Sequence, residues 1–189
     1  MKQQNENMSA QSDRDFLAKE PIGKLLAKLA LPTVAAQMIN MLYNIVDRIY
    51  IGHIPDTGAL ALTGVGVCMP LIMIITAFAA LVGNGGAPRA TIFMGKNKKD
   101  DAEKILANCF TMQILLSIVL TVVLLIWNRD FLLAFGASAN TIEYATSYMN
   151  IYALGTIFVQ LTLGMNAFIT AQGFAKEGML SVLIGAVVN

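Results

Sequence analysis

Long apolar runs separated by short charged connections dominate this chain of 189 residues. A helix needs about 20 apolar residues to cross the hydrocarbon of a bilayer. Lipid offers no hydrogen-bond partner to irregular backbone, so runs of this length form helices rather than isolated strands. The pattern therefore predicts an all-α polytopic membrane protein. The intervals without a charged residue are 29–46, 57–88, 105–128, 131–142, 144–175 and 178–189.

These intervals predict five transmembrane helices, of which four are complete and the fifth is truncated. The interval 131–142 is too short to cross alone, so we interpret it as the entry to the fourth helix. The glycine-rich stretch 83–89, which contains Pro88, is expected to end the second helix. Residues 1–15 are polar and predict a disordered cytoplasmic tail. The predicted helices lie at about 25–52, 60–83, 105–127, 141–170 and 178–189.

Positive charges fall almost entirely on one side of the predicted membrane. The segment before residue 29 carries five Lys or Arg and the connection 84–104 carries five more, whereas 53–59 has none and 128–140 has one. Cytoplasmic connections of membrane proteins carry the excess of Lys and Arg. The distribution therefore predicts a multi-pass protein of the cell membrane with its amino terminus in the cytoplasm.

Composition supports a membrane protein and excludes other classes. Hydrophobic residues make up 56% of the chain and charged residues 13%, with a mean hydropathy of +0.63. The net charge of +1 provides no basic excess for binding nucleic acid. Cys68 and Cys109 form neither a disulfide framework nor a zinc motif. The sequence contains no Ser/His/Asp set, catalytic carboxylate pair or metal-ligand cluster, so we do not expect an enzyme.

Asp47 is an acidic residue inside the first predicted membrane helix. A charged side chain there costs about 3 kcal/mol or more, so it normally faces a protein interior or a hydrated cavity and has a function. Its neighbour Arg48 projects about 100° away around the helix, so the two are poorly placed to form a salt bridge. We expect Asp47 to point inward and Arg48 to reach the outer interface or another helix.

Gln37, Asn40 and Asn44 extend the polar character of Asp47 along the same helix. Steps of three, four and three residues place the four side chains on one face, within about 80°. A polar stripe that ends in a carboxylate is typical of a hydrated cavity or a cation site. The alternative is that these groups form hydrogen bonds to neighbouring helices.

Several short motifs occur in a fixed order over residues 20–189. They are Leu31-Pro32-Thr33, residues 42–53, the connection Gly86–Lys104, Ala171-Gln172-Gly173 and Gly185–Asn189. In order and spacing they resemble the multidrug and toxin extrusion (MATE) family, especially its MepA-like branch. The resemblance implies that residues 16–189 form part of a six-helix amino-terminal lobe, which a second pseudo-symmetric lobe completes.

The resemblance also implies a function. Relatives export drugs, chiefly hydrophobic organic cations, by antiport against protons or sodium ions, which links the chain to antibiotic resistance and xenobiotic transport. Asp47 and Asn189 match positions of the family's coupling-cation site, where Na⁺ would bind transiently. No cofactor and no resident metal are implied. The acidic residue expected four positions after Asn189 lies beyond residue 189.

Polar and aromatic side chains on the first and fourth helices are the candidates for lining a drug cavity. These candidates are Gln37, Asn40, Tyr43, Asn44, Tyr148, Asn150 and Gln160. A lipid-intermediate flippase would require a more basic cavity than Arg48 alone provides. The competing hypothesis is a non-transporting membrane interaction protein or an inactive fragment, because the sixth helix and the second lobe are absent. We expect the chain to be unstable unless the remainder of the transporter fold covers its polar stripe.

Overall fold

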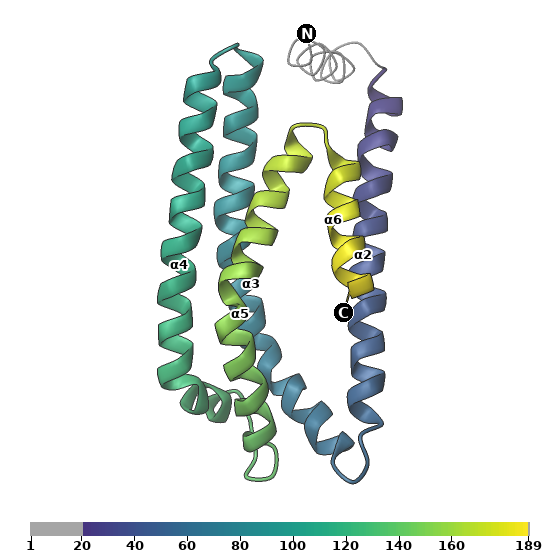
Figure 1. Cartoon of the computed structure of the whole chain (residues 1–189), viewed down its shortest axis with the longest axis vertical. Helices are drawn as coiled ribbons and strands as arrows, with labels where there is room; N and C mark the ends of the chain where they lie inside the picture. The colour runs from purple at the N-terminus through teal and green to yellow at the C-terminus, as the bar shows by residue number, and fades with distance from the viewer. Residues whose placement is uncertain (1–20, 189) are drawn as a thin grey trace. The chain divides into compact units, whose positions relative to one another are not determined.

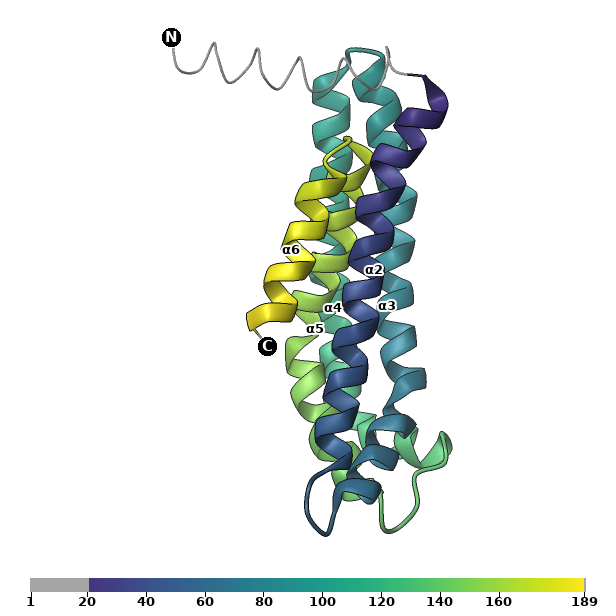
Figure 2. The same ribbon diagram turned by 90° about the vertical axis from the view of Figure 1, so that its right-hand side faces the viewer.

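The structure is a computed structural model that describes residues 21–188. These residues form five α-helices joined by short connections (Figure 1, Figure 2). Within this range there is no strand, and the predicted all-α fold class is confirmed. The predicted tail at residues 1–15 and the candidate Asn189 lie outside the described residues. The helices are α2 (Ile22–Gly52), α3 (Gly58–Gly95), α4 (Lys99–Ala134), α5 (Ile142–Ala171) and α6 (Ala175–Val188).

Four of these helices, α2 to α5, are long and apolar enough to cross a membrane by length and composition. Helix α6 has 14 residues. At 1.5 Å per residue it covers about 21 Å, which is less than the hydrocarbon thickness of about 30 Å. The described residues therefore contain four complete candidate spans and a shorter fifth helix, as the hydropathy pattern predicts.

Helix α3 continues past its predicted end at residue 83 and reaches Gly95. The prediction that the stretch 83–89 ends the helix is therefore wrong. Tertiary packing explains the difference, because Gly83 lies against the backbone of Gly164 on α5, and Gly86 lies against Phe168. Pro88 removes only one backbone N–H from the helix, which neighbouring helices compensate in a membrane.

Helix α4 also extends beyond both ends of the predicted span 105–127. Residues expected in the cytoplasmic connection form its first turns, where Asp100 and Asp101 lie near the positive end of the helix dipole. At the other end, residues 131–134 belong to α4 rather than to the entry of the next helix. Gly136 follows with φ of +101°, a left-handed conformation that ends a helix and favours glycine.

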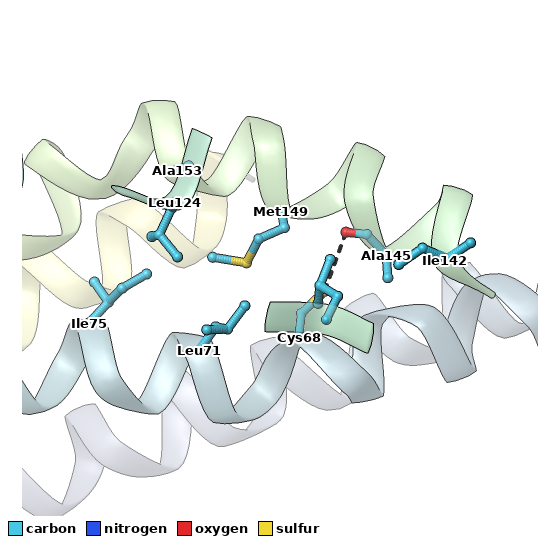
Figure 3. Close-up of a cluster of buried hydrophobic side chains, with 9 residues drawn as sticks. Cys68, Leu71, Ile75, Leu124, Ile142, Ala145, Met149 and Ala153 are labelled. Carbon is cyan, nitrogen blue, oxygen red and sulfur yellow. Dashed lines mark hydrogen bonds between the residues drawn. The ribbon is translucent and has the colours of Figure 1, made fainter. Parts of the chain in front are cut away.

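The chain divides into two compact units. Among the described residues, 21–43 and 169–188 form one unit, and Asn44–Phe168 form the other. In the second unit, a hydrophobic core lies between α3, α4 and α5 (Figure 3). The thiol of Cys68 on α3 donates a hydrogen bond of 3.4 Å to the carbonyl oxygen of Ala145 on α5 (Figure 3). The core includes Cys68, Leu71, Ile75, Leu124, Leu132, Ala145, Met149 and Ala153.

Candidate functional site

Helix α2 carries the predicted polar stripe on one uninterrupted helix, so its side chains share one face. Pro32 is the one residue of α2 that is fully buried. In the first unit, Gln37 is exposed, and Asn40 and Tyr43 are half-buried. Most of α2 is therefore accessible, including polar groups that a membrane helix would not present to lipid.

The second unit contains the carboxylate end of the stripe. Asp47 is half-buried there, whereas Asn44 and Arg48 are exposed. The guanidinium of Arg48 donates a hydrogen bond of 3.5 Å to the Sδ atom of Met69 on α3. Arg48 therefore reaches a neighbouring helix from its position beside Asp47.

Tyr148 of α5 lies within electrostatic range of the charges of Asp47 and Arg48. It is half-buried and packs against the hydrophobic core. Its ring stacks on that of Tyr152, with centroids 6.3 Å apart and planes inclined by 24°. The second unit therefore holds a carboxylate and a stacked tyrosine pair within electrostatic range of each other.

The other two candidates of α5 contact helices α3 and α4. Oδ1 of Asn150 accepts a hydrogen bond from Nδ2 of Asn128 on α4. Gln160 is fully buried, and its Nε2 donates a hydrogen bond of 2.9 Å to the carbonyl oxygen of Ile75 on α3. Both interactions are typical of polar packing between membrane helices. The structure therefore places Tyr148 within electrostatic range of Asp47 and gives Asn150 and Gln160 contacts within the α3–α5 bundle.

Sequence reasoning missed a polar face on α4. Gln113, Ser117 and Asn128 are buried there, and Thr121 donates a hydrogen bond of 3.0 Å to the carbonyl oxygen of Ala153 on α5. Steps of four, four and seven residues place the four polar side chains on one side of the helix. The same spacing rule that reveals the stripe on α2 would have found this face.

Among residues 21–188, no three His, Cys, Asp or Glu side chains lie together in a group that could hold a metal ion. Asp47 is a half-buried carboxylate on a helix long enough to cross a membrane, a position where an acidic residue usually has a function.

Similarity to known proteins decides the family. A family model described as MatE matches residues 32–189. The chain belongs to the MATE family. MATE proteins are transporters, so this chain is a multi-pass membrane protein and not an enzyme.

Two relatives show how much of a MATE transporter the chain represents. The multidrug export protein MepA of Staphylococcus haemolyticus is 21% identical over 174 residues, which are 92% of this chain and 38% of MepA. The FAD transporter of Shewanella oneidensis is 22% identical over 177 residues, which are 94% of this chain and 38% of that protein. The chain thus spans 38% of the length of either relative.

The MATE fold is also found in a solved relative. The crystal structure of a MATE protein in complex with MaD3S superposes with a TM-score of 0.82 at 22% sequence identity. The similarity covers 91% of this chain and 38% of that protein. The described helices therefore adopt part of a MATE fold, which confirms the fold that the sequence motifs imply.

Proposed function

We propose that this MATE chain is part of an antiporter that exports drugs, chiefly hydrophobic organic cations, in exchange for protons or sodium ions. Membership of the MATE family and similarity to MepA support the proposal. The observation that carries it is the half-buried carboxylate of Asp47, on a helix long enough to span the membrane and within electrostatic range of Tyr148. Ion exchange of this kind needs no cofactor.

Asp47 is the proposed coupling residue. A proton or cation from outside neutralises its carboxylate and lowers the cost of keeping a charge within the membrane. Neutralisation drives transport when it favours one of two conformations over the other. One charge that moves through 100 mV supplies about 2.3 kcal/mol, enough for more than about tenfold drug accumulation. Asn189 is proposed as a second coupling residue from its match to the family motif.

The proposed drug contacts in the second unit are Asn44, Asp47 and Tyr148. Asp47 supplies negative charge, Tyr148 supplies an aromatic face, and Asn44 supplies a hydrogen-bonding amide on the same face of α2 as Asp47. Such a combination favours flat hydrophobic cations, because the charge and the ring faces attract the same ligand. Ethidium has this chemistry and is the probe that we would use first.

A second substrate class is favoured by Arg48. This residue is exposed beside Asp47, and a guanidinium is the side chain best suited to hold phosphate groups. The chain is also similar to a protein named as an FAD transporter. FAD combines a flat ring system with phosphates, so an anionic substrate of this kind is the alternative to an organic cation.

Transport by proteoliposomes tests these proposals. They contain an extended form, in which the chain is joined to the rest of a two-lobed MATE transporter. We expect ethidium to accumulate against an imposed proton or sodium gradient, and the gradient that drives it identifies the coupling ion. FAD is assayed in parallel vesicles. Movement of FAD without ethidium would contradict the cationic substrate, and movement of neither under either gradient would contradict antiport.

The proposed orientation places the amino terminus in the cytoplasm, so Ile54 lies outside and Lys98 inside. Both residues are exposed in connections between helices. Single cysteines, Ile54→Cys and Lys98→Cys, are introduced into a Cys68→Ala, Cys109→Ala background. A membrane-impermeant maleimide added to intact cells is expected to label Ile54→Cys and to leave Lys98→Cys unlabelled until the membrane is opened. The opposite labelling pattern would overturn the orientation.

The competing proposal is that the 189-residue chain alone does not transport. It spans 38% of the length of MepA. Large apolar side chains along α2 are exposed, among them Leu31, Met38 and Met41. We infer that the rest of a transporter fold covers α2 in a working antiporter. The chain alone is then expected to export nothing, whereas the extended form is expected to export ethidium.

A further inference from the structure

Two glutamines on different helices point into the bundle of α3, α4 and α5 and bind the same helix. Gln113 on α4 and Gln160 on α5 are both fully buried. The surrounding sequence is uncharged over long stretches, because no Asp, Glu, Lys or Arg occurs in 57–88, 105–128 or 144–175. Two neutral amides are therefore the strongest hydrogen-bonding side chains in this part of the interior.

The two amide nitrogens bind neighbouring turns of α3. Nε2 of Gln113 donates a hydrogen bond of 3.1 Å to the carbonyl oxygen of Ala79. Nε2 of Gln160 donates one of 2.9 Å to the carbonyl oxygen of Ile75. Because Ile75 and Ala79 are four residues apart, their carbonyl groups lie about 6 Å apart along the axis, slightly more than one helical turn.

Gly164 shows that the two glutamines share one region of the interior. It lies on α5 one turn after Gln160, and a Cβ atom at this position would collide with the amide nitrogen of Gln113. The side chain of Gln113 therefore lies against α5 one helical turn after Gln160. The two amides approach the same short section of α3 from two different helices.

Both amide oxygens in this section are buried without a donor. Among the described residues, neither Oε1 of Gln113 nor Oε1 of Gln160 has a hydrogen-bond partner. The nearby buried hydroxyls do not supply one, because Ser117 donates to the carbonyl oxygen of Ile114 and Thr156 donates to that of Tyr152. Leaving a buried acceptor unpaired is costly, and two such acceptors in one place point to a shared donor.

We propose that a water molecule is bound between Gln113 and Gln160 and donates its two O–H groups to the two Oε1 atoms. Water is the ligand that fits, since it is neutral and carries two donors. A bound cation would also satisfy the oxygens, but the region lacks the carboxylate that would offset the cost of burying a charge. The water then links α4 to α5, while the two amide nitrogens link both helices to α3.

Nuclear magnetic resonance of the extended form in detergent micelles, with ¹⁵N-labelled glutamine, tests the proposal. The side-chain NH₂ signals of Gln113 and Gln160 are identified by their loss in Gln113→Leu and Gln160→Leu. In the unsubstituted chain, we expect both NH₂ groups to show magnetisation transfer from a long-lived water. In Gln113→Leu the transfer to Gln160 is expected to disappear, and the reciprocal loss is expected at Gln113 in Gln160→Leu.

The control is Thr111→Val, which changes an exposed polar side chain on α4 and is expected to leave both water contacts intact. Absence of transfer at both amides in the unsubstituted chain would overturn the proposal, even if the glutamine variants do not fold. Persistence of the contact at Gln160 in a folded Gln113→Leu chain would overturn the shared water. A shift of both NH₂ signals when sodium replaces choline in the buffer would show a cation instead.

Discussion

Ethidium export by the extended form is expected to fall at least about tenfold when Asp47 is replaced by asparagine. Asparagine has nearly the size of aspartate and keeps its hydrogen-bonding capacity. It cannot take up a proton or balance the charge of a cation, so the ion gradient no longer shifts the equilibrium between the transporter's conformations. The measurement is the rate of ethidium loss from energised cells that carry equal amounts of the two forms in the membrane.

The matched control is Asp56→Asn, the same change at an exposed position in the connection between α2 and α3. Asp56 has φ of 62°, and asparagine adopts this left-handed conformation as readily as aspartate. Export is expected to be unchanged in this variant. Undiminished export by Asp47→Asn would refute the coupling role, and an equal loss in both variants would point to a general effect of removing negative charge.

Gly83→Leu is expected to destabilise the extended form strongly, through a loss of about 3 kcal/mol or more. A Cβ atom at Gly83 would lie 2.9 Å from the carbonyl oxygen of Gly164 and 3.1 Å from its Cα atom. These are backbone atoms, so α3 and α5 would have to separate to make room. Size-exclusion chromatography and thermal melting in detergent measure the loss of folded protein.

Gly85→Leu is the control for this prediction, because it adds the same side chain to the same helix. Gly85 is exposed, and no atom lies within 4 Å of the position that its Cβ would take. Its side chain would extend into lipid, where leucine is favourable. A normal yield and melting temperature are expected. If Gly83→Leu melted at the same temperature as Gly85→Leu, the close contact between α3 and α5 would be wrong.

The five helices follow from the sequence because charged residues interrupt long apolar runs, and backbone in lipid must be hydrogen-bonded internally. The residues at which the helices begin and end are harder to predict from the sequence. The glycines at 83 and 86 and Pro88 weaken a helix locally, yet α3 continues to Gly95 because α5 packs against this stretch. Such a contact joins residues some 80 positions apart in sequence and has no local signature.

The candidate site was also predictable only in part, because the sequence reveals individual residues but not the contacts between helices. Asp47 stands out because a carboxylate in an apolar helix is expensive. Spacing also shows which residues of α5 share a face, but it does not show which helix that face contacts. Only the structure shows that Tyr148 is near Asp47, whereas Asn150 bonds to α4 and Gln160 bonds to α3.

The most direct test of the central claim, that Asp47 couples drug export to an ion gradient, compares three forms in one ethidium assay with energised cells. These are the 189-residue chain, the extended form and the extended form with Asp47→Asn. We predict export by the unsubstituted extended form alone. Export by the short chain would show that it assembles into a transporter by itself, and export by the extended Asp47→Asn form at the unsubstituted rate would contradict the claim.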